Sequence, residues 1–155
     1  MTYRIEGLRP DLFQPLFDLT DDELAAQGAR RVTADAKPGF PCRVSLEDAE
    51  PGEALMLLNF VSHDVAGPFR TTYGIYVRKD ADEAPAFVDE APAFLNGRTL
   101  GLRGFDAEGM LKGGMIALPG EADAKIRELL DRPEIDTIHA HSAAFGCFLA
   151  RIERH

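Results

Sequence analysis

Two neighbouring segments near the C-terminal end alternate apolar and polar residues, and this pattern constrains the fold more than any other feature. In residues 135–141, apolar side chains at positions 138 and 140 alternate with two histidines. In residues 147–152, apolar side chains at positions 148, 150 and 152 alternate with a cysteine, a leucine and an arginine. A period of two is typical of strands, so the segments predict an antiparallel hairpin.

The register of this hairpin can be predicted, because the apolar sets of the two strands must share the buried face. That condition places Ala140 opposite Phe148. A three-residue loop over residues 143–145 then places His141 directly across from Cys147, and His139 across from Leu149. Cross-strand Cβ atoms lie about 5 Å apart, so the imidazole and thiol would be neighbours. A two-residue turn is the alternative, and it would move Cys147 to the opposite face.

The candidate chemistry of this hairpin rests on His139, His141 and Cys147. Imidazole and thiol groups bind metals or act as base and nucleophile near neutral pH. The histidines would equally suit the solvent-exposed side of a hairpin at the edge of a sheet. The cysteines would equally suit small buried positions. His63, in a loop, is expected to be solvated.

Three further candidates come from the middle of the chain. Cys42 and Arg43 belong to a stiff turn with two prolines, and the arginine would favour a thiolate if the thiol were exposed. An arginine in a turn is more often a surface charge. The apolar run Ala54–Leu58 predicts a central strand that ends at Asn59. The Asn59 amide would then either cap a loop or line the mouth of a pocket.

Composition limits the possible partners and the compartment. The chain of 155 residues is 45% hydrophobic and has no evident linker, which predicts a single domain over residues 1–155. A net charge of −9 without a basic cluster argues against nucleic acid or an anionic membrane as partner. Without a signal-peptide core or a membrane-spanning apolar run, we expect a cytoplasmic protein with reduced thiols. A Cys42–Cys147 disulfide is the alternative in an oxidising compartment.

Local signals predict the other elements of an α+β fold, with a mostly antiparallel sheet and a few short helices. A capping box from Thr20 to Glu23 begins a helix over residues 21–27, and an amphipathic helix is expected between Pro119 and Pro133. Residues 84–96 are interpreted as exposed linker and turn. Strands are expected over residues 3–8, 29–34 and 71–78, with a hairpin of 99–106 and 110–118.

Four segments carry a resemblance to a known family: residues 37–53, 57–59, 104–110 and 139–147. They resemble a bacterial family known as domain of unknown function 1203. The resemblance covers nearly the whole chain, and its specific parts are the Pro-Cys-Arg block at 41–43 and the His-x-His…Gly-Cys block. It implies a stand-alone protein of one domain and no particular activity.

Three classes of function remain, and we rank them as follows. The first is a module that binds a small polar or anionic ligand in a pocket lined by Arg43, Asn59 and the two histidines. The second is a transition-metal protein, although the distant cysteines argue against a tight structural metal. The third is an enzyme with a cysteine nucleophile and a histidine base. No nucleotide fingerprint follows any strand, so no cofactor is expected. The oligomeric state stays open.

Overall fold

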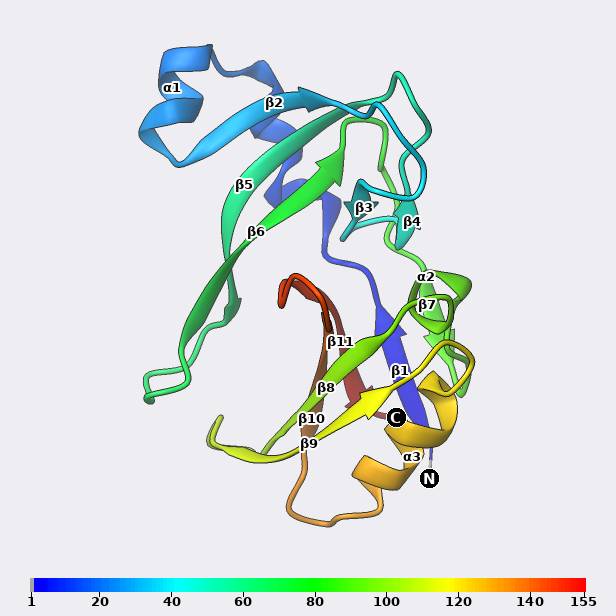
Figure 1. Ribbon diagram of the computed structural model, residues 1–155. Coiled ribbons are helices and arrows are strands. Elements are labelled where there is room, and N and C mark those ends of the chain that lie inside the picture. The colour runs from blue at the N-terminus through cyan, green and yellow to red at the C-terminus, as the bar shows by residue number, and fades with distance from the viewer. Residues whose placement is uncertain (1) are drawn as a thin grey trace. The chain divides into compact units, whose positions relative to one another are not determined.

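Two mostly antiparallel sheets organise the chain in the computed structural model, which describes residues 2–155 (Figure 1). The first sheet has six strands in the order β7-β1-β11-β10-β8-β9, and the second has five in the order β2-β5-β6-β3-β4. A few short helices accompany them. The prediction of an α+β fold with mostly antiparallel strands is therefore confirmed.

The strand bounds are as follows. The six-stranded sheet contains β1 (Tyr3–Glu6), β7 (Ala86–Val88), β8 (Leu100–Phe105), β9 (Leu111–Ala117), β10 (Thr137–Ser142) and β11 (Phe148–Arg154). The five-stranded sheet contains β2 (Ala29–Thr33), β3 (Pro41–Cys42), β4 (Glu47–Asp48), β5 (Ala54–His63) and β6 (Thr71–Arg78). The α-helices are α1 (Asp21–Ala26), α2 (Ala93–Asn96) and α3 (Ala122–Leu130), and 3-10 turns span Pro10–Leu12 and Gln14–Asp18.

The chain divides into two structural units, each of which contains most of one sheet. Unit 1 consists of the chain up to Glu6, Val61–Thr71 and Ala86–His155. Unit 2 consists of Gly7–Phe60 and Thr72–Pro85. The far end of the β5–β6 hairpin thus belongs to unit 1, while the rest of both strands belongs to unit 2. A single domain over residues 1–155 stays a prediction.

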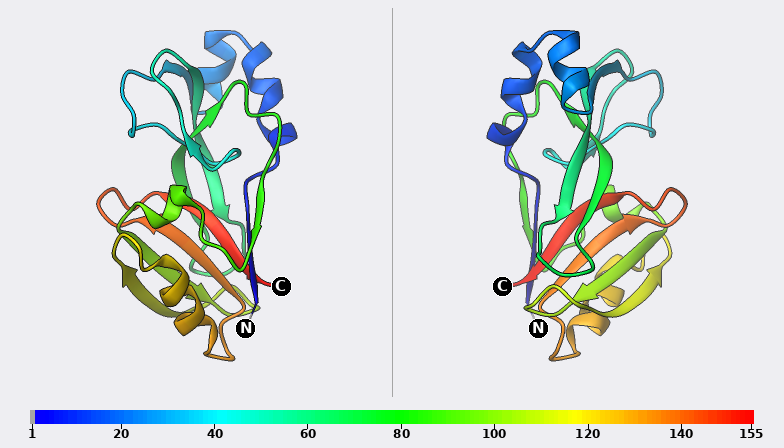
Figure 2. Two further views of the ribbon diagram at one scale, coloured as in Figure 1. Left: turned by 90° about the vertical axis from the view of Figure 1, so that its right-hand side faces the viewer. Right: turned by 90° about the vertical axis from the view of Figure 1, so that its left-hand side faces the viewer.

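In unit 1, helix α3 covers one face of the six-stranded sheet. Ala122, Ile126, Leu129 and Leu130 are buried, as the amphipathic pattern predicted. The phenol of Tyr3, on β1, donates a hydrogen bond of 2.5 Å to Asp123 at the start of the helix. The pairing register places Tyr3, Ile138 and Ala140 on this same face. Figure 2 shows α3 alongside β9 from two sides.

In unit 2, the predicted capping box begins helix α1. The Thr20 hydroxyl accepts a hydrogen bond from the Glu23 N–H, and the Glu23 carboxylate accepts one from the Thr20 N–H. Leu24 is buried with Ala29 and Met56, so the helix packs on the sheet through a single large side chain. Among residues 2–155, no helix combines the length and apolar character that crossing a membrane requires.

Two predictions about the secondary structure are wrong. Residues 84–96 are not only linker, because they contain β7 and α2, and Phe94 and Leu95 of α2 are buried. Their burial stabilises an element too short for its period to be recognised. The apolar strand does not end at Asn59 either, since β5 runs on to His63. Asn59 is an exposed residue within that strand.

Candidate functional site

Strands β10 and β11 form the predicted hairpin, but the predicted register is wrong. His139 lies opposite Arg151, and Ala140 lies opposite Ala150 rather than Phe148. After a bulge at positions 140 and 141, His141 lies opposite Phe148, not Cys147. The connection is longer than expected because Ser142 organises a turn through its hydroxyl and carbonyl groups, with Gly146 at a φ of 77°. Cys147 therefore precedes the strand.

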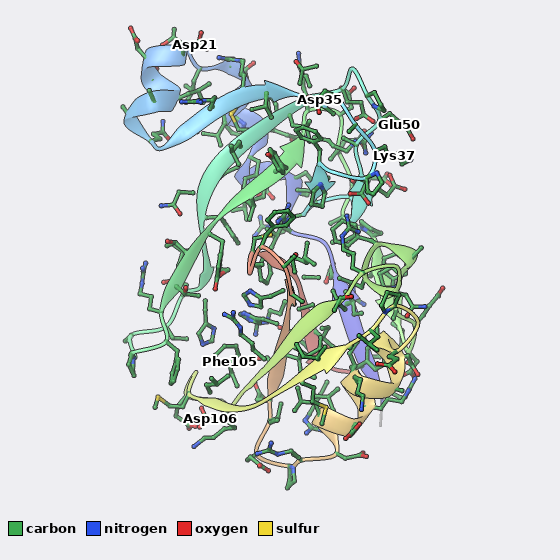
Figure 3. The ribbon with its side chains drawn as sticks, in the orientation of Figure 1. Asp21, Asp35, Lys37, Glu50, Phe105 and Asp106 are labelled. Carbon is green, nitrogen blue, oxygen red and sulfur yellow. The ribbon has the colours of Figure 1, made fainter. Side chains whose placement is uncertain are left out.

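The two histidines do not lie on an exposed edge. Strand β10 is an inner strand between β8 and β11, and both imidazoles are only 2% exposed. They project from the sheet face opposite α3, together with Phe105 and Phe148. We call the cluster formed there by His63, Phe105, His139, His141 and Phe148 the histidine cluster. Figure 3 labels Phe105 at the end of β8.

The His139 ring contacts every other ring of the histidine cluster. The His139 ring centroid lies 5.0 Å from that of His63, at 90°, and 5.0 Å from that of Phe105. It lies 5.4 Å from the Phe148 centroid and 6.4 Å from the His141 centroid. Distances of this size are typical of packed aromatic pairs. His139 is thus the ring that all the others surround.

The three imidazoles differ in their hydrogen bonds. His63 Nε2 lies 3.0 Å from the Gly109 carbonyl oxygen, and His141 Nδ1 lies 3.0 Å from the Gly146 carbonyl oxygen. Each of these nitrogens carries the proton, because a carbonyl can only accept. His139 Nδ1 is buried, and no group within residues 2–155 hydrogen-bonds to it. Buried polar atoms almost always have a partner, so this nitrogen is the exception.

Burial keeps His139 and His141 neutral at pH 7. Loss of solvation lowers the pKa of His139 to about 3, and the neighbouring His63 and Arg151 lower it further. Loss of solvation also lowers the pKa of His141 to about 4, against the opposing effect of the Gly146 carbonyl. At pH 7 both rings are therefore uncharged hydrogen-bonding groups. Such weak bases are poorly matched to general-base catalysis near neutral pH.

Positive charge comes instead from the neighbouring strands. Arg103 on β8 and Arg151 on β11 occupy the register positions on either side of His139. Directly opposed residues project to the same face of a sheet, so a row of Arg, His and Arg crosses three strands. Arg151 is exposed and forms an ion pair with Glu153 at 2.7 Å. Arg103 is half-buried beside the cluster.

The sequence-based prediction missed His63. It was expected to be solvated in a loop, but it is the last residue of β5, 7% exposed, and its ring lies 4.1 Å from that of Phe105. The continuation of strand β5 past Asn59 carries it into the cluster. Phe60 and Val61 were the signal available for this, since aromatic and β-branched residues are favoured in strands.

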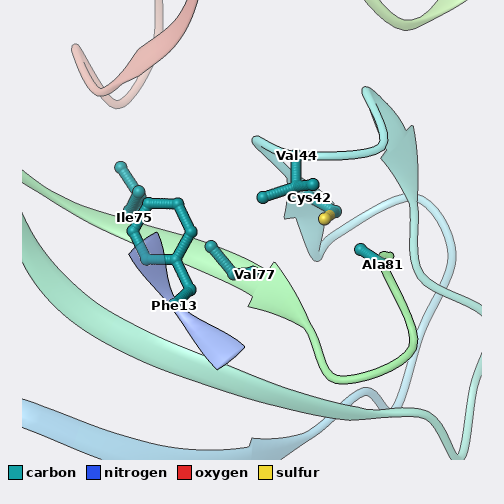
Figure 4. Close-up of a cluster of buried hydrophobic side chains, with 6 residues drawn as sticks. All are labelled: Phe13, Cys42, Val44, Ile75, Val77 and Ala81. Carbon is teal, nitrogen blue, oxygen red and sulfur yellow. The ribbon is translucent and has the colours of Figure 1, made fainter. Parts of the chain in front are cut away.

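The remaining candidates belong to unit 2. Cys42 is buried with Phe13, Val44, Ile75, Val77 and Ala81 (Figure 4). Its sulfur accepts hydrogen bonds from the Ser45 and Arg78 N–H groups, at 3.5 and 3.3 Å. Arg43 is not a surface charge: it is 1% exposed, and its guanidinium donates to the Pro41 carbonyl. Neither cysteine forms a disulfide.

Metal ligation is the second class of function that the sequence predicts. Within residues 2–155, no group of three or more histidine, cysteine, aspartate or glutamate side chains has an arrangement suited to a metal ion. The bonds to Gly109 and Gly146 also occupy one nitrogen each of His63 and His141. The described geometry therefore gives metal binding no positive support.

The comparisons with known proteins agree with the resemblance noted in the sequence. A family model described as a protein of unknown function, DUF1203, matches residues 39–154. No curated protein matches the chain, and no solved structure does. The matched range includes the Pro-Cys-Arg block and both histidines of β10. The chain therefore belongs to the DUF1203 family.

Proposed function

We propose that unit 1 binds a small polar or anionic molecule at the histidine cluster. The observation that carries this proposal is His139 Nδ1, a buried polar atom without a hydrogen-bond partner in the described chain. Leaving such an atom unsatisfied costs about 1–3 kcal/mol, and an external partner would recover that cost. A ligand group, or a water that a ligand displaces, supplies this partner.

The surroundings of His139 define the class of ligand. A neutral imidazole has one donor and one acceptor, and the donors of His63 and His141 already bond to the Gly109 and Gly146 carbonyls. His139 is therefore the ring of the cluster that can donate to a ligand, through Nδ1. Arg103, at the adjacent register position, provides a guanidinium that suits carboxylate or phosphate oxygens. Phe105 and Phe148 provide apolar rings in contact with His139. A small molecule with an anionic group and an apolar body matches this combination.

The proposal uses fewer residues than the sequence suggested. Cys42, Arg43 and Asn59 belong to unit 2 and are not needed for it. Cys147 is also left out, because it does not lie opposite His141. The ligand site therefore rests on His139 and His141, with His63 and Arg103 added.

The test is an NMR titration of protein labelled with ¹⁵N in its histidine rings. Benzoate serves as the probe, because it joins a carboxylate to a flat ring, and benzyl alcohol is the uncharged comparison. We expect a saturable shift of the His139 Nδ1 resonance with benzoate and a weaker one with benzyl alcohol. The His139→Phe variant should lose benzoate binding, whereas His155→Phe, which changes an exposed histidine, should retain it.

Two outcomes would count against this function. One is the absence of any saturable shift at His139 with either probe. The other is binding of equal strength by wild type and His139→Phe. A parallel titration with zinc chloride tests the metal alternative. Stoichiometric zinc binding that shifts the ring resonances of His63, His139 and His141 together would favour metal binding over binding of a small molecule.

A further inference from the structure

Strand β2 is an edge strand of unit 2, and its outer side is open. It pairs only with β5, in the register that sets Ala29 opposite Leu58 and Thr33 opposite Ala54. The Asn59 N–H bonds to the Gly28 carbonyl, and the Ala34 N–H bonds to the Glu53 carbonyl. These bonds fix which residues of β2 turn their backbone groups toward β5. Figure 1 shows β2 at the border of its sheet, next to α1.

Backbone groups alternate in direction along an antiparallel strand. Because Gly28 and Ala34 face β5, the residues at positions 30 and 32 do so as well. Ala29, Arg31 and Thr33 therefore point their N–H and C=O groups away from the sheet. Across residues 2–155, none of these outward backbone groups has a backbone partner. Such a row of unpaired groups is a template for one more strand.

Two hollows flank this strand and offer places for side chains of an added strand. One, of about 700 Å³, is lined by Leu24, Ala25 and Leu57 together with Arg30 and the Asp21–Arg31 ion pair. The other, of about 270 Å³, is lined by Phe17, Val32 and Leu55 together with Lys79. Both combine apolar walls with a basic group. In peptide recognition by strand addition, such pockets receive alternate side chains.

The charges on the edge indicate what kind of strand fits. The guanidinium of Arg31 is already paired within the chain, because it forms an ion pair with Asp21 at 2.7 Å and donates to the Phe17 and Leu19 carbonyls. Arg30 and Lys79 form no ion pair with any residue from 2 to 155. In a chain with a net charge of −9, these two cations stand out, because Arg30 lies on the edge strand and Lys79 lines the second hollow from the far side of β5. They complement an acidic partner.

A second copy of the chain fits this edge poorly. Pairing β2 antiparallel with another β2 would place the adjacent arginines of both copies close together. Like charges opposite each other on neighbouring strands are destabilising. From the open backbone, the two hollows and the unpaired cations, we propose that β2 binds an extended acidic segment of another protein as an added strand. This site is separate from the histidine cluster and does not depend on the function proposed there.

The proposal is tested with the full chain and two short fluorescein-labelled peptides. One alternates glutamate with valine, and the other alternates lysine with valine. Fluorescence anisotropy should show that the acidic peptide binds at least about tenfold more tightly than the basic one. Its affinity should fall with added salt, because exposed charges are screened.

Two pairs of variants separate charge from backbone pairing. Arg30→Glu should weaken the acidic peptide by about fivefold, while Arg30→Lys keeps the charge and should bind nearly as wild type. Thr33→Pro removes an outward N–H and should weaken binding by about tenfold, whereas Thr33→Ala keeps that group and should not. If Thr33→Pro fails to fold, the Arg30 pair and the basic peptide still decide the question.

Three results would overturn the proposal. The first is equal binding of the two peptides, or no rise in anisotropy with either. The second is equal affinity of Thr33→Pro and Thr33→Ala for the acidic peptide when both variants are folded. The third is self-association in sedimentation that Thr33→Pro abolishes, because the edge would then serve a second copy.

Discussion

The imidazoles of His63 and His139 stand perpendicular to each other with their ring centroids 5.0 Å apart, one at the end of β5 and the other in an inner strand of the six-stranded sheet. A proton on either ring would repel a proton on the other. Burial adds a second penalty, because a buried cation loses its solvation. The packing of this cluster therefore depends on an uncharged His139.

Acidification should destabilise the protein below about pH 6.5. The pKa of His139 is lowered to about 3 and that of His141 to about 4, from an ordinary value of 6.5. Between these values the unfolded chain binds more protons, so the free energy of unfolding falls as the pH falls. Each unit of pKa corresponds to about 1.4 kcal/mol, which gives a loss of several kcal/mol near pH 4. Urea unfolding at a series of pH values measures it.

The contribution of the cluster can be separated from general acid effects by substitution. His139→Phe removes one titrating ring from the buried cluster, so its stability should depend less steeply on pH than that of wild type. His155→Gln removes an exposed histidine and should leave the pH dependence unchanged. A free energy of unfolding that stays constant from about pH 7 to about pH 4.5 in the wild type would show that the cluster tolerates protons.

A pair of glycine variants tests how the His63 hydrogen bond is supported. Gly109 has a φ of 83°, and a Cβ there would lie 2.7 Å from the side chain of Val65. Gly120 has a similar φ of 88° but open space around it. Gly120→Ala should cost about 1 kcal/mol of stability from backbone strain alone. Gly109→Ala should cost roughly 2 kcal/mol more, because the clash adds to the strain.

The Gly109→Ala and Gly120→Ala variants can also be compared by NMR, through the hydrogen bond of His63. The Gly109 carbonyl accepts that bond, so a shift of its backbone should also change the ring nitrogen resonances of His63. Gly120→Ala should leave those resonances in place. Equal losses of stability in the two variants would show that the Val65 side chain moves aside without destabilising the protein.

The capping box of α1 gives a third prediction. Thr20→Ala removes the hydroxyl that accepts the Glu23 N–H and should lower the free energy of unfolding by about 1 kcal/mol. Thr20→Ser keeps the acceptor and serves as the control, with little expected loss. Chemical denaturation of the three proteins under one set of conditions makes the comparison. A loss of equal size in both variants would assign the effect to the Thr20 methyl group.

The elements that were predicted correctly depend on neighbours in sequence. The capping box at Thr20, the stripe on α3 and the turn of the β8–β9 hairpin each lie within one short segment. Periodicity and turn chemistry act over that range, so a single sequence contains enough information to recognise them.

The candidate site could not be predicted fully, because its residues meet through tertiary contacts that local sequence patterns do not contain. The hairpin register shifted because Ser142 forms bonds within a longer loop, and a shift in pairing changes which side chains meet. His63 joins His139 only because β5 extends past Asn59 into the other unit. Arg43 looked like a surface charge, and its burial depends on tertiary packing. None of these three relationships produces a periodic pattern in the sequence, so sequence patterns alone could not predict them.

The two cysteines should react at very different rates with a thiol reagent such as Ellman's reagent. Neither forms a disulfide, and Cys147 is half-buried whereas Cys42 is fully buried in the apolar cluster of unit 2. The native protein should therefore release about one equivalent of chromophore quickly and the second only on unfolding, since a buried thiol is inaccessible. Cys147→Ser should abolish the fast phase and leave the slow one. Two fast thiols in the native protein would show that the apolar cluster opens readily, and no reactive thiol in denaturant would reveal a disulfide.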